Sequence, residues 1–378
     1  MGKLMGIQWF IGVFSILLFE WAGPAIAGAP APPPKTSGPH PEHLVANIGN
    51  FQFENGQVIK DFKVSYVTHG KLNKKQDNVI LAFHAFTDDH HGVDYLIGPG
   101  KALDTDKYFI VATDFLGNAR LSHDVTTGPT NSGLRMNFPP YTIRDSVNVE
   151  YKFVKEYLGI DEVRATVGCS IGAMKSYQIA LSYPNFVRGV IPMAGSPDIN
   201  YQARAQLRNA MDIIAIDSGW FGGNYEENPR LGVTTALMNF PPWWYSKKWY
   251  FANLTNEVQY LEWKVFWHDV FTRFAPQDAR DIYFQLQSWA NYNIGDSPGF
   301  NGDARAALSS IEPKVLLIGI KDDLMVRREE MLFAKENIPN VQLLEIDSAF
   351  GHLGGCGFDP EANKIMNREI AKFLEGLR

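Results

Sequence analysis

The sequence predicts a doubly wound α/β fold, in which helices cover both faces of a mostly parallel sheet, with one helical insertion. Short, nearly continuous apolar runs recur along the 378 residues, as expected of strands that are buried on both faces. Segments with helical spacing separate several of these runs, which indicates a parallel sheet. The expected strands are residues 79–83, 108–112, 165–167, 190–193 and 315–318, and the expected helices are residues 144–157, 171–181, 329–336 and 362–377.

The first residues have the layout of a secretory signal peptide. Lys3 precedes an apolar stretch at residues 4–19, and small residues follow up to Ala27, where we expect cleavage. The alternatives are a buried N-terminal helix and an uncleaved anchor. Residues 28–43 are crowded with proline and predict a tether. We therefore expect a periplasmic or secreted protein that has no stable membrane association after residues 1–27 are removed.

The folded part begins with an alternating pattern. Within residues 50–67, alternating apolar positions flank the turn signal Asn55-Gly56, which predicts an antiparallel hairpin at a sheet edge. We assign residues 44–196 to the first part of the α/β core and residues 303–378 to its second part.

Residues 197–302 break the alternation of strands and helices. No buried-strand run occurs there, and seven of the nine tryptophans accumulate in it. We expect a helical lid whose inner face forms an apolar, aromatic pocket. The alternative is a helical insertion that packs on itself. The tryptophans are Trp220, Trp243, Trp244, Trp249, Trp263, Trp267 and Trp289.

Charge and cysteine content limit the classes of partner. The net charge is −6, from 41 acidic and 35 basic residues without a basic block, so no nucleic-acid partner is indicated and a small molecule is expected. The two cysteines, Cys169 and Cys356, are too few for a disulfide scaffold. We expect two buried free thiols rather than a disulfide, although each lies close in sequence to a candidate catalytic residue.

The strongest motif is Gly168-Cys169-Ser170-Ile171-Gly172. It follows an apolar run and opens a helical segment, so the G-x-S-x-G pattern has the strand-turn-helix context of the α/β-hydrolase fold. The glycines permit a sharp turn, and the start of the helix brings backbone N–H groups close to the serine oxygen. Ser170 is the predicted nucleophile.

A serine nucleophile needs a histidine base that is oriented by a carboxylate, and this fold supplies them in the chain order Ser, Asp, His. His352 follows an apolar run and precedes the last helix, so it is the predicted base. Asp322 and Asp323 both leave the strand that ends near residue 320, and they compete for the role of acid. Asp347 is a weaker candidate because it lies just before the histidine loop.

Acyl transfer also requires two backbone donors for the oxyanion. One is expected from Ile171, the residue after the serine. The other is expected from the loop after strand 79–83, where Phe86 is the predicted donor.

The chain resembles the homoserine O-acetyltransferase family of the α/β-hydrolase superfamily. The matching stretches are residues 84–87, Leu96-Ile97-Gly98-Pro99-Gly100 continued to residue 109, Thr127-Gly128-Pro129, Thr142-Ile143-Arg144-Asp145, the serine elbow with Met174, and Tyr183-Pro184. The family's acid lies in a Ser-Asp-x-Leu stretch, which implies Asp323, and its histidine lies in a Tyr-Gly-His stretch, which implies His352. The chain departs from the family at Asp88, where the family has glycine. It also departs in the elbow, which reads Gly-Cys-Ser-Ile-Gly-Ala where the family has Gly-Gly-Ser-Met-Gly-Gly.

We expect an exported ester or amide hydrolase that acts through an acyl-enzyme on Ser170 and takes a small-molecule acyl ester. The alternatives are a CoA-dependent O-acyltransferase like the named family and a non-catalytic binding protein. No cofactor is expected, and a homodimer is left open. The stretch Asp88-Asp89-His90-His91, with Asp94, lacks an established metal-ligand spacing. We therefore expect a solvated loop beside the pocket and no metal site.

Overall fold

The computed structural model describes residues 41–117, 126–255, 268, 271, 272, 274 and 277–377. All of them belong to one unit of the chain, Pro34–Arg378. The predicted signal peptide, the predicted tether up to residue 40, and Trp263 and Trp267 lie outside the described residues.

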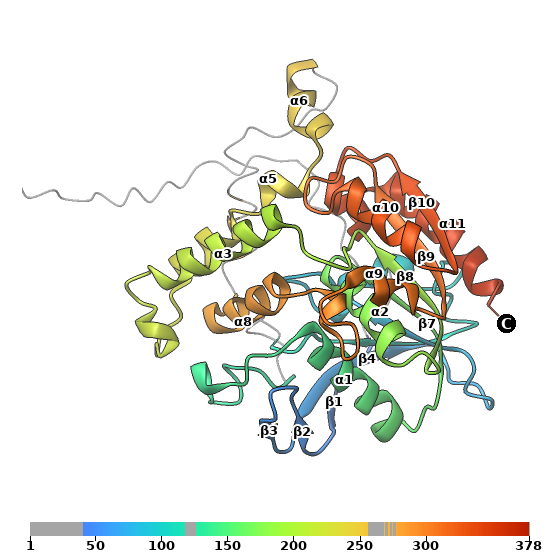
Figure 1. The fold of residues 1–378 in the computed structure, drawn as a ribbon, viewed down its shortest axis with the longest axis horizontal. Helices are drawn as coiled ribbons and strands as arrows, with labels where there is room; N and C mark the ends of the chain where they lie inside the picture. The colour runs from blue at the N-terminus through green and yellow to red at the C-terminus, as the bar shows by residue number, and fades with distance from the viewer. Residues whose placement is uncertain are drawn as a thin grey trace, which may run out of the picture. The chain divides into compact units, whose positions relative to one another are not determined.

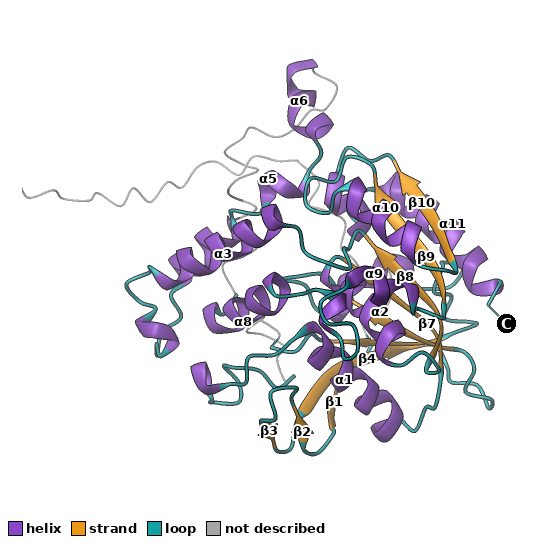
Figure 2. Ribbon diagram, in the orientation of Figure 1, coloured by secondary structure: helices purple, strands orange, loops and turns teal. Residues whose placement is uncertain are grey.

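An eight-stranded sheet forms the centre of this unit (Figure 2). The pairs from β6 to β10 are parallel, and the edge pairs β1–β4 and β4–β6 are antiparallel. In spatial order the strands are β1 (Leu44–Asn47), β4 (Lys63–His69), β6 (Phe109–Thr113), β5 (Val79–Phe83), β7 (Val163–Cys169), β8 (Val187–Met193), β9 (Lys314–Ile320) and β10 (Val341–Ile346). This arrangement confirms the predicted mostly parallel sheet.

Both faces of the sheet are buried, which explains why the strands read as continuous apolar runs. In β5, Val79, Leu81 and Phe83 belong to one hydrophobic core, and Ile80 and Ala82 belong to the other. Helices cover the two faces (Figure 1). The first core includes residues of α1 (Ile143–Lys152), α2 (Ile171–Ser182), α9 (Ala304–Ser309) and α10 (Arg328–Asn337), and the second includes residues of η1 (His90–Leu96), η6 (Gly351–Cys356) and α11 (Pro360–Glu375).

The hairpin predicted within residues 50–67 is only partly correct. A turn lies at Asn55-Gly56, but it joins two short strands, β2 (Phe51–Gln52) and β3 (Val58–Ile59), which form a separate two-stranded sheet. The next strand, β4, pairs with β1 and β6 instead. The alternating pattern marked the strands but not their partners, because pairing depends on strands that are distant in sequence.

Within residues 197–302, the structure describes helices and no strands. The α3 and α8 helices contact each other and lie side by side in Figure 1. Among the described residues, no helix combines the length and the apolar character that a membrane span requires. The elements are α3 (Tyr201–Ala215), η4 (Phe221–Gly223), α4 (Arg230–Leu237), α5 (Pro241–Trp244), α6 (Lys247–Thr255), α8 (Ala279–Ala290) and η5 (Ile294–Asp296); elsewhere the chain also forms η2 (Arg135–Asn137) and the π-helical turn η3 (Phe153–Tyr157).

The expectation of two free thiols is wrong. Cys169 and Cys356 form a disulfide, with their Cα atoms 5.5 Å apart. Cys169 ends β7 and Cys356 ends η6, so the bridge joins parts of the chain that are 187 residues apart. The sequence did not reveal this pairing, because it depends on how η6 packs against the end of β7.

Candidate active site

Ser170 occupies a sharp turn between β7 and α2. Its backbone has φ 57° and ψ −117°, a conformation that L-residues rarely adopt. The glycines on either side allow the approach that this turn requires. A Cβ on Gly172 would lie 2.5 Å from the carbonyl oxygen of Phe83, and a Cβ on Gly168 would collide with the Gly172 backbone. Gly168 and Gly172 are therefore required by close packing around the turn, since neither has a positive φ of its own.

The structure brings the three predicted triad residues together. His352 Nε2 lies 2.9 Å from Ser170 Oγ, and His352 Nδ1 lies 2.8 Å from Asp323 Oδ2. All three residues are buried. If Nδ1 donates its hydrogen to the carboxylate, Nε2 presents its lone pair to the serine hydroxyl. This is the arrangement that a general base needs to accept the hydroxyl proton.

Of the two adjacent carboxylates, Asp323 is the one that reaches His352. Its second oxygen, Oδ1, accepts hydrogen bonds from the backbone N–H groups of Met325 (2.7 Å) and Val326 (2.9 Å). These bonds fix the carboxylate in the turn after β9. Asp322 and Asp347 are both exposed, and no contact between either of them and His352 is found in the described structure.

A pocket of about 80 Å³ opens onto Ser170 and His352. Residues 197–302 contribute Trp244, Tyr245 and Trp289 to its wall, as the tryptophan content of this segment predicted. Asp88, Tyr245 and His352 are the ionisable side chains among its described lining residues. The full lining is Ala85, Phe86, Thr87, Asp88, Ser170, Trp244, Tyr245, Trp289, Met325, His352, Leu353, Cys356 and Phe358.

The loop after β5 supplies the expected position of the second oxyanion donor. Phe86 lines the pocket, and its ring packs 5.4 Å from that of Trp289. His84 supports this loop, because its Nδ1 lies 2.7 Å from the carbonyl oxygen of Ala85 and its Nε2 accepts the N–H of Phe115 at 2.9 Å. Ile171 is the first residue of α2, so no earlier turn of the helix engages its N–H. Phe86 therefore lies in the wall of the pocket, and Ile171 directly follows Ser170 in the chain.

Burial favours the neutral form of His84. Desolvation lowers the pKa of His84, although the nearby carboxylate of Asp114 opposes this effect. A neutral imidazole with its hydrogen on Nδ1 satisfies both of the observed hydrogen bonds. His84 thus acts as a backbone brace in the resting protein.

The loop that contains residues 88–94 differs from the solvated loop that we expected. Asp88 does border the pocket, but Asp89, His90 and Asp94 are buried. Internal hydrogen bonds explain the burial, since Asp89 caps η1 by accepting the His91 N–H at 3.0 Å. The loop also contacts His43, which the sequence did not connect with it. Nothing in the local pattern signals that contact across 47 residues.

The comparisons with known proteins agree with this fold. Residues 78–354 match the family model for the alpha/beta hydrolase fold. Homoserine O-acetyltransferase of Methanococcoides burtonii is 30% identical over 346 residues, covering 80% of this chain and 68% of that protein.

Two solved structures are similar over most of their length. Esterase E22 has a TM-score of 0.78 at 26% identity, covering 88% of this chain and 99% of that one. Homoserine O-acetyltransferase from Bacillus anthracis has a TM-score of 0.77 at 26% identity, covering 89% of this chain and 97% of that one. On its fold, its sequence matches and these structural neighbours, the chain belongs to the α/β-hydrolase fold family, in the group that resembles homoserine O-acetyltransferase.

Proposed function

We propose that this chain is a serine-dependent enzyme that transfers a short acyl group, with Ser170 as nucleophile, His352 as base and Asp323 as the residue that orients the base. The observation that carries the proposal is the pair of hydrogen bonds from Asp323 through His352 to Ser170, which ends at a pocket. Such a chain of contacts activates a hydroxyl that is too weakly acidic to react unaided.

The reaction has two stages. Ser170 Oγ forms a bond to the acyl carbon while its proton passes to His352 Nε2, and the leaving alcohol or thiol takes that proton as its bond to the acyl carbon breaks. The hydroxyl of the acceptor, an alcohol or water, then attacks the acyl carbon while its proton passes to His352 Nε2. The bond from the acyl carbon to Ser170 Oγ breaks as that oxygen takes the proton back from His352. The N–H groups of Ile171 and Phe86 stabilise the oxyanion in both stages.

The size and lining of the pocket favour a small acyl group. Its volume of about 80 Å³ is smaller than that of an apolar cavity of roughly 150 Å³ that binds benzene. The aromatic rings of Trp244 and Trp289 make the wall largely apolar. An acetyl-sized group fits this space, and residues 197–302 are the lid that closes over it in this proposal.

An alcohol is the acceptor that the sequence relatives support best. The name of the M. burtonii relative, homoserine O-acetyltransferase, favours this alternative over the hydrolase that we expected from the sequence. The B. anthracis structure has the same name and covers nearly the whole fold. Transfer to an alcohol requires the acyl-enzyme to be protected from water, which the buried positions of Ser170 and His352 favour.

Hydrolysis is the second candidate, and the pocket is the observation that favours it. The carboxylate of an amino-acid acceptor would need a cationic or bidentate partner. Among the described residues that line the pocket, no lysine or arginine is present. The similarity to esterase E22 points in the same direction.

Export is part of this proposal. The pattern at residues 1–27 supports it, and so does the Cys169–Cys356 disulfide, because disulfides persist mainly in oxidising compartments. Outside the cytosol acetyl-CoA is not supplied, so an exported enzyme would take its acyl group from another ester. Cell fractionation followed by thiol titration of the isolated protein tests this point.

The fate of the acyl-enzyme distinguishes transfer to an alcohol from transfer to water. The enzyme is acetylated with p-nitrophenyl acetate, and the decay of the acyl-enzyme is followed in water, with added L-homoserine and with simple alcohols. Slow decay in water and rapid decay with one alcohol supports the transferase, and fast decay that alcohols do not change supports the hydrolase. A Ser170→Ala variant serves as control, and acylation of that variant would contradict the whole proposal.

A further inference from the structure

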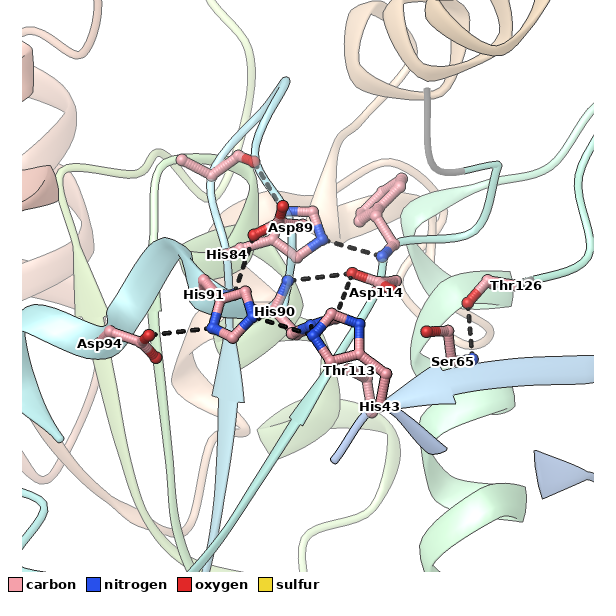
Figure 3. Close-up of polar contacts among 12 residues, drawn as sticks. His43, Ser65, His84, Asp89, His90, His91, Asp94, Thr113, Asp114 and Thr126 are labelled. Carbon is pink, nitrogen blue, oxygen red and sulfur yellow. Dashed lines mark hydrogen bonds and ion pairs between the residues drawn. The ribbon is translucent and has the colours of Figure 1, made fainter. Parts of the chain in front are cut away.

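Three histidines from two distant parts of the chain meet on one side of the sheet. His43 lies directly before β1, and His90 and His91 begin η1. His43 Nε2 lies 3.4 Å from His90 Nε2 and 3.3 Å from His91 Nε2. Figure 3 shows the three histidines close together, with Asp94 beside His91 and Asp114 beside His90. None of these histidines is among the described residues that line the pocket at Ser170.

Carboxylates set the orientation of two of the rings. His90 Nδ1 lies 2.9 Å from Asp114 Oδ1, and His91 Nδ1 lies 2.9 Å from Asp94 Oδ2. When each Nδ1 donates its hydrogen to a carboxylate, each Nε2 directs a lone pair toward His43. This pairing of carboxylate and imidazole is the usual support for histidines that bind a metal.

The spacing of the nitrogen atoms suits a tetrahedral ion. With Zn–N distances of about 2.0–2.1 Å, two ligands at the tetrahedral angle lie about 3.3–3.4 Å apart. The two measured Nε2 separations are 3.4 and 3.3 Å, and one ring nitrogen from each of the three histidines lies within 4.8 Å of the others.

We propose that His43, His90 and His91 form a binding site for one divalent transition-metal ion, and that Zn²⁺ is the ion that the site suits best. Neutral imidazoles bind Zn²⁺, Cu²⁺ and Ni²⁺ well, and the tetrahedral spacing favours Zn²⁺ among them. Water completes the coordination. The inference does not depend on the proposed acyl transfer.

The position of the site gives the ion a structural role. The ion would join His43, directly before β1, to η1. The η1 helix follows the loop that contains Phe86. An ion that binds the folded chain and not the unfolded chain raises stability in proportion to its occupancy. Zn²⁺ therefore holds the first strand against the loop beside the pocket.

Metal titration of the full chain, prepared without a histidine tag and stripped with a chelator, tests the proposal. Calorimetry should show one equivalent of Zn²⁺ bound per chain, and Co²⁺ should give the intense visible absorption of a tetrahedral site. Zn²⁺ should also raise the melting temperature. Because His43 is exposed, His43→Gln should fold normally and lose the Co²⁺ spectrum and the thermal shift.

Two variants sharpen the test. Asp94→Asn, which removes the support of His91, should weaken Zn²⁺ binding by about 10–100-fold. His43→Gln, which removes a ligand, should weaken it more. His268→Gln, a histidine outside the cluster, is the matched control and should bind as the parent does. If the parent chain did not bind Zn²⁺, or if His43→Gln bound it as the parent does, the inference would be overturned. The Asp94–His91 ion pair would then be the explanation of the cluster.

Discussion

At the scale of single residues, Ser170 and His352 should act as one unit. Ser170→Ala should fold and lose at least about 10³-fold in turnover, because the covalent step disappears while the pocket remains. His352→Ala should lose nearly as much, since its Nε2 is the atom beside Ser170 Oγ. The double variant should be scarcely worse than either single variant. Steady-state kinetics on all three proteins checks this. If the loss in the double variant equalled the product of the two single losses, the two residues would act independently.

The two adjacent carboxylates provide a matched pair of variants. Asp323→Asn should reduce turnover on the order of 10⁴-fold, because an amide favours the wrong tautomer of His352. Asp322→Asn changes an exposed side chain and should keep nearly the parent activity. Circular dichroism of both variants should match that of the parent. If Asp322→Asn were the inactive variant, the geometry of the site would not describe the working enzyme.

His84 should affect the pH dependence of stability. Burial lowers its folded-state pKa, so between that value and the unfolded value of about 6.5 the unfolded chain binds more protons. Its contribution is therefore complete above about pH 6.5 and decreases as the pH falls below that value. In His84→Gln, the drop in melting temperature between pH 7.5 and 5.5 should be smaller than in the parent. An equal drop in both proteins would show that His84 does not titrate in this range.

At the scale of secondary-structure elements, a buried ion pair joins α1 to α2, the helix that begins after Ser170. Lys175 Nζ lies 2.5 Å from Glu150 Oε1, and both side chains are almost fully buried. Thr113 Oγ1 in β6 donates to the same oxygen at 2.7 Å. The aromatic rings of Phe83 and Phe115 surround the ammonium group. Each charge therefore depends on the other for compensation.

Removal of one partner should destabilise the protein strongly. Lys175→Met should cost about 3–5 kcal/mol, because Glu150 would keep a buried charge without its partner. Replacement of both, by Lys175→Met with Glu150→Leu, should recover much of the loss. Guanidinium unfolding of the two single variants and the double variant measures this. A single variant as stable as the parent would mean that water or relaxation compensates the remaining charge.

At the scale of the whole molecule, the Cys169–Cys356 disulfide connects the two parts of the core. It joins the residue before Ser170 to the end of η6, which includes His352. Because it closes a long loop, its loss should cost about 2–5 kcal/mol of stability. The bridge also limits how far the serine turn and the histidine loop can separate.

Reduction of the native protein should therefore lower its melting temperature and its activity together. Thiol titration should find no reactive thiol in the native chain and two after reduction under denaturing conditions. The Cys169→Ala/Cys356→Ala variant should be destabilised in the same way and should not respond to reductant, which controls for reagent effects. Two titratable thiols in the untreated protein would contradict the pairing.

The sequence by itself determined the local elements and their order. The apolar runs at residues 79–83 and 315–318 lie within β5 and β9, and the predicted helix at 171–181 lies within α2. These predictions succeeded because burial on both faces and helical periodicity depend on neighbouring residues. The G-x-S-x-G motif located Ser170 for the same reason, since its turn is made by adjacent residues.

Only the tertiary structure decided which distant residues meet. The sequence did not show that β4 pairs with β1, that Cys169 joins Cys356, or that His43 reaches His90. From the residues alone it also left Asp322 and Asp323 in competition, and only the turn after β9 directs one of them to His352. Each of these contacts depends on how loops pack against the assembled sheet, so no pattern of neighbouring residues encodes it.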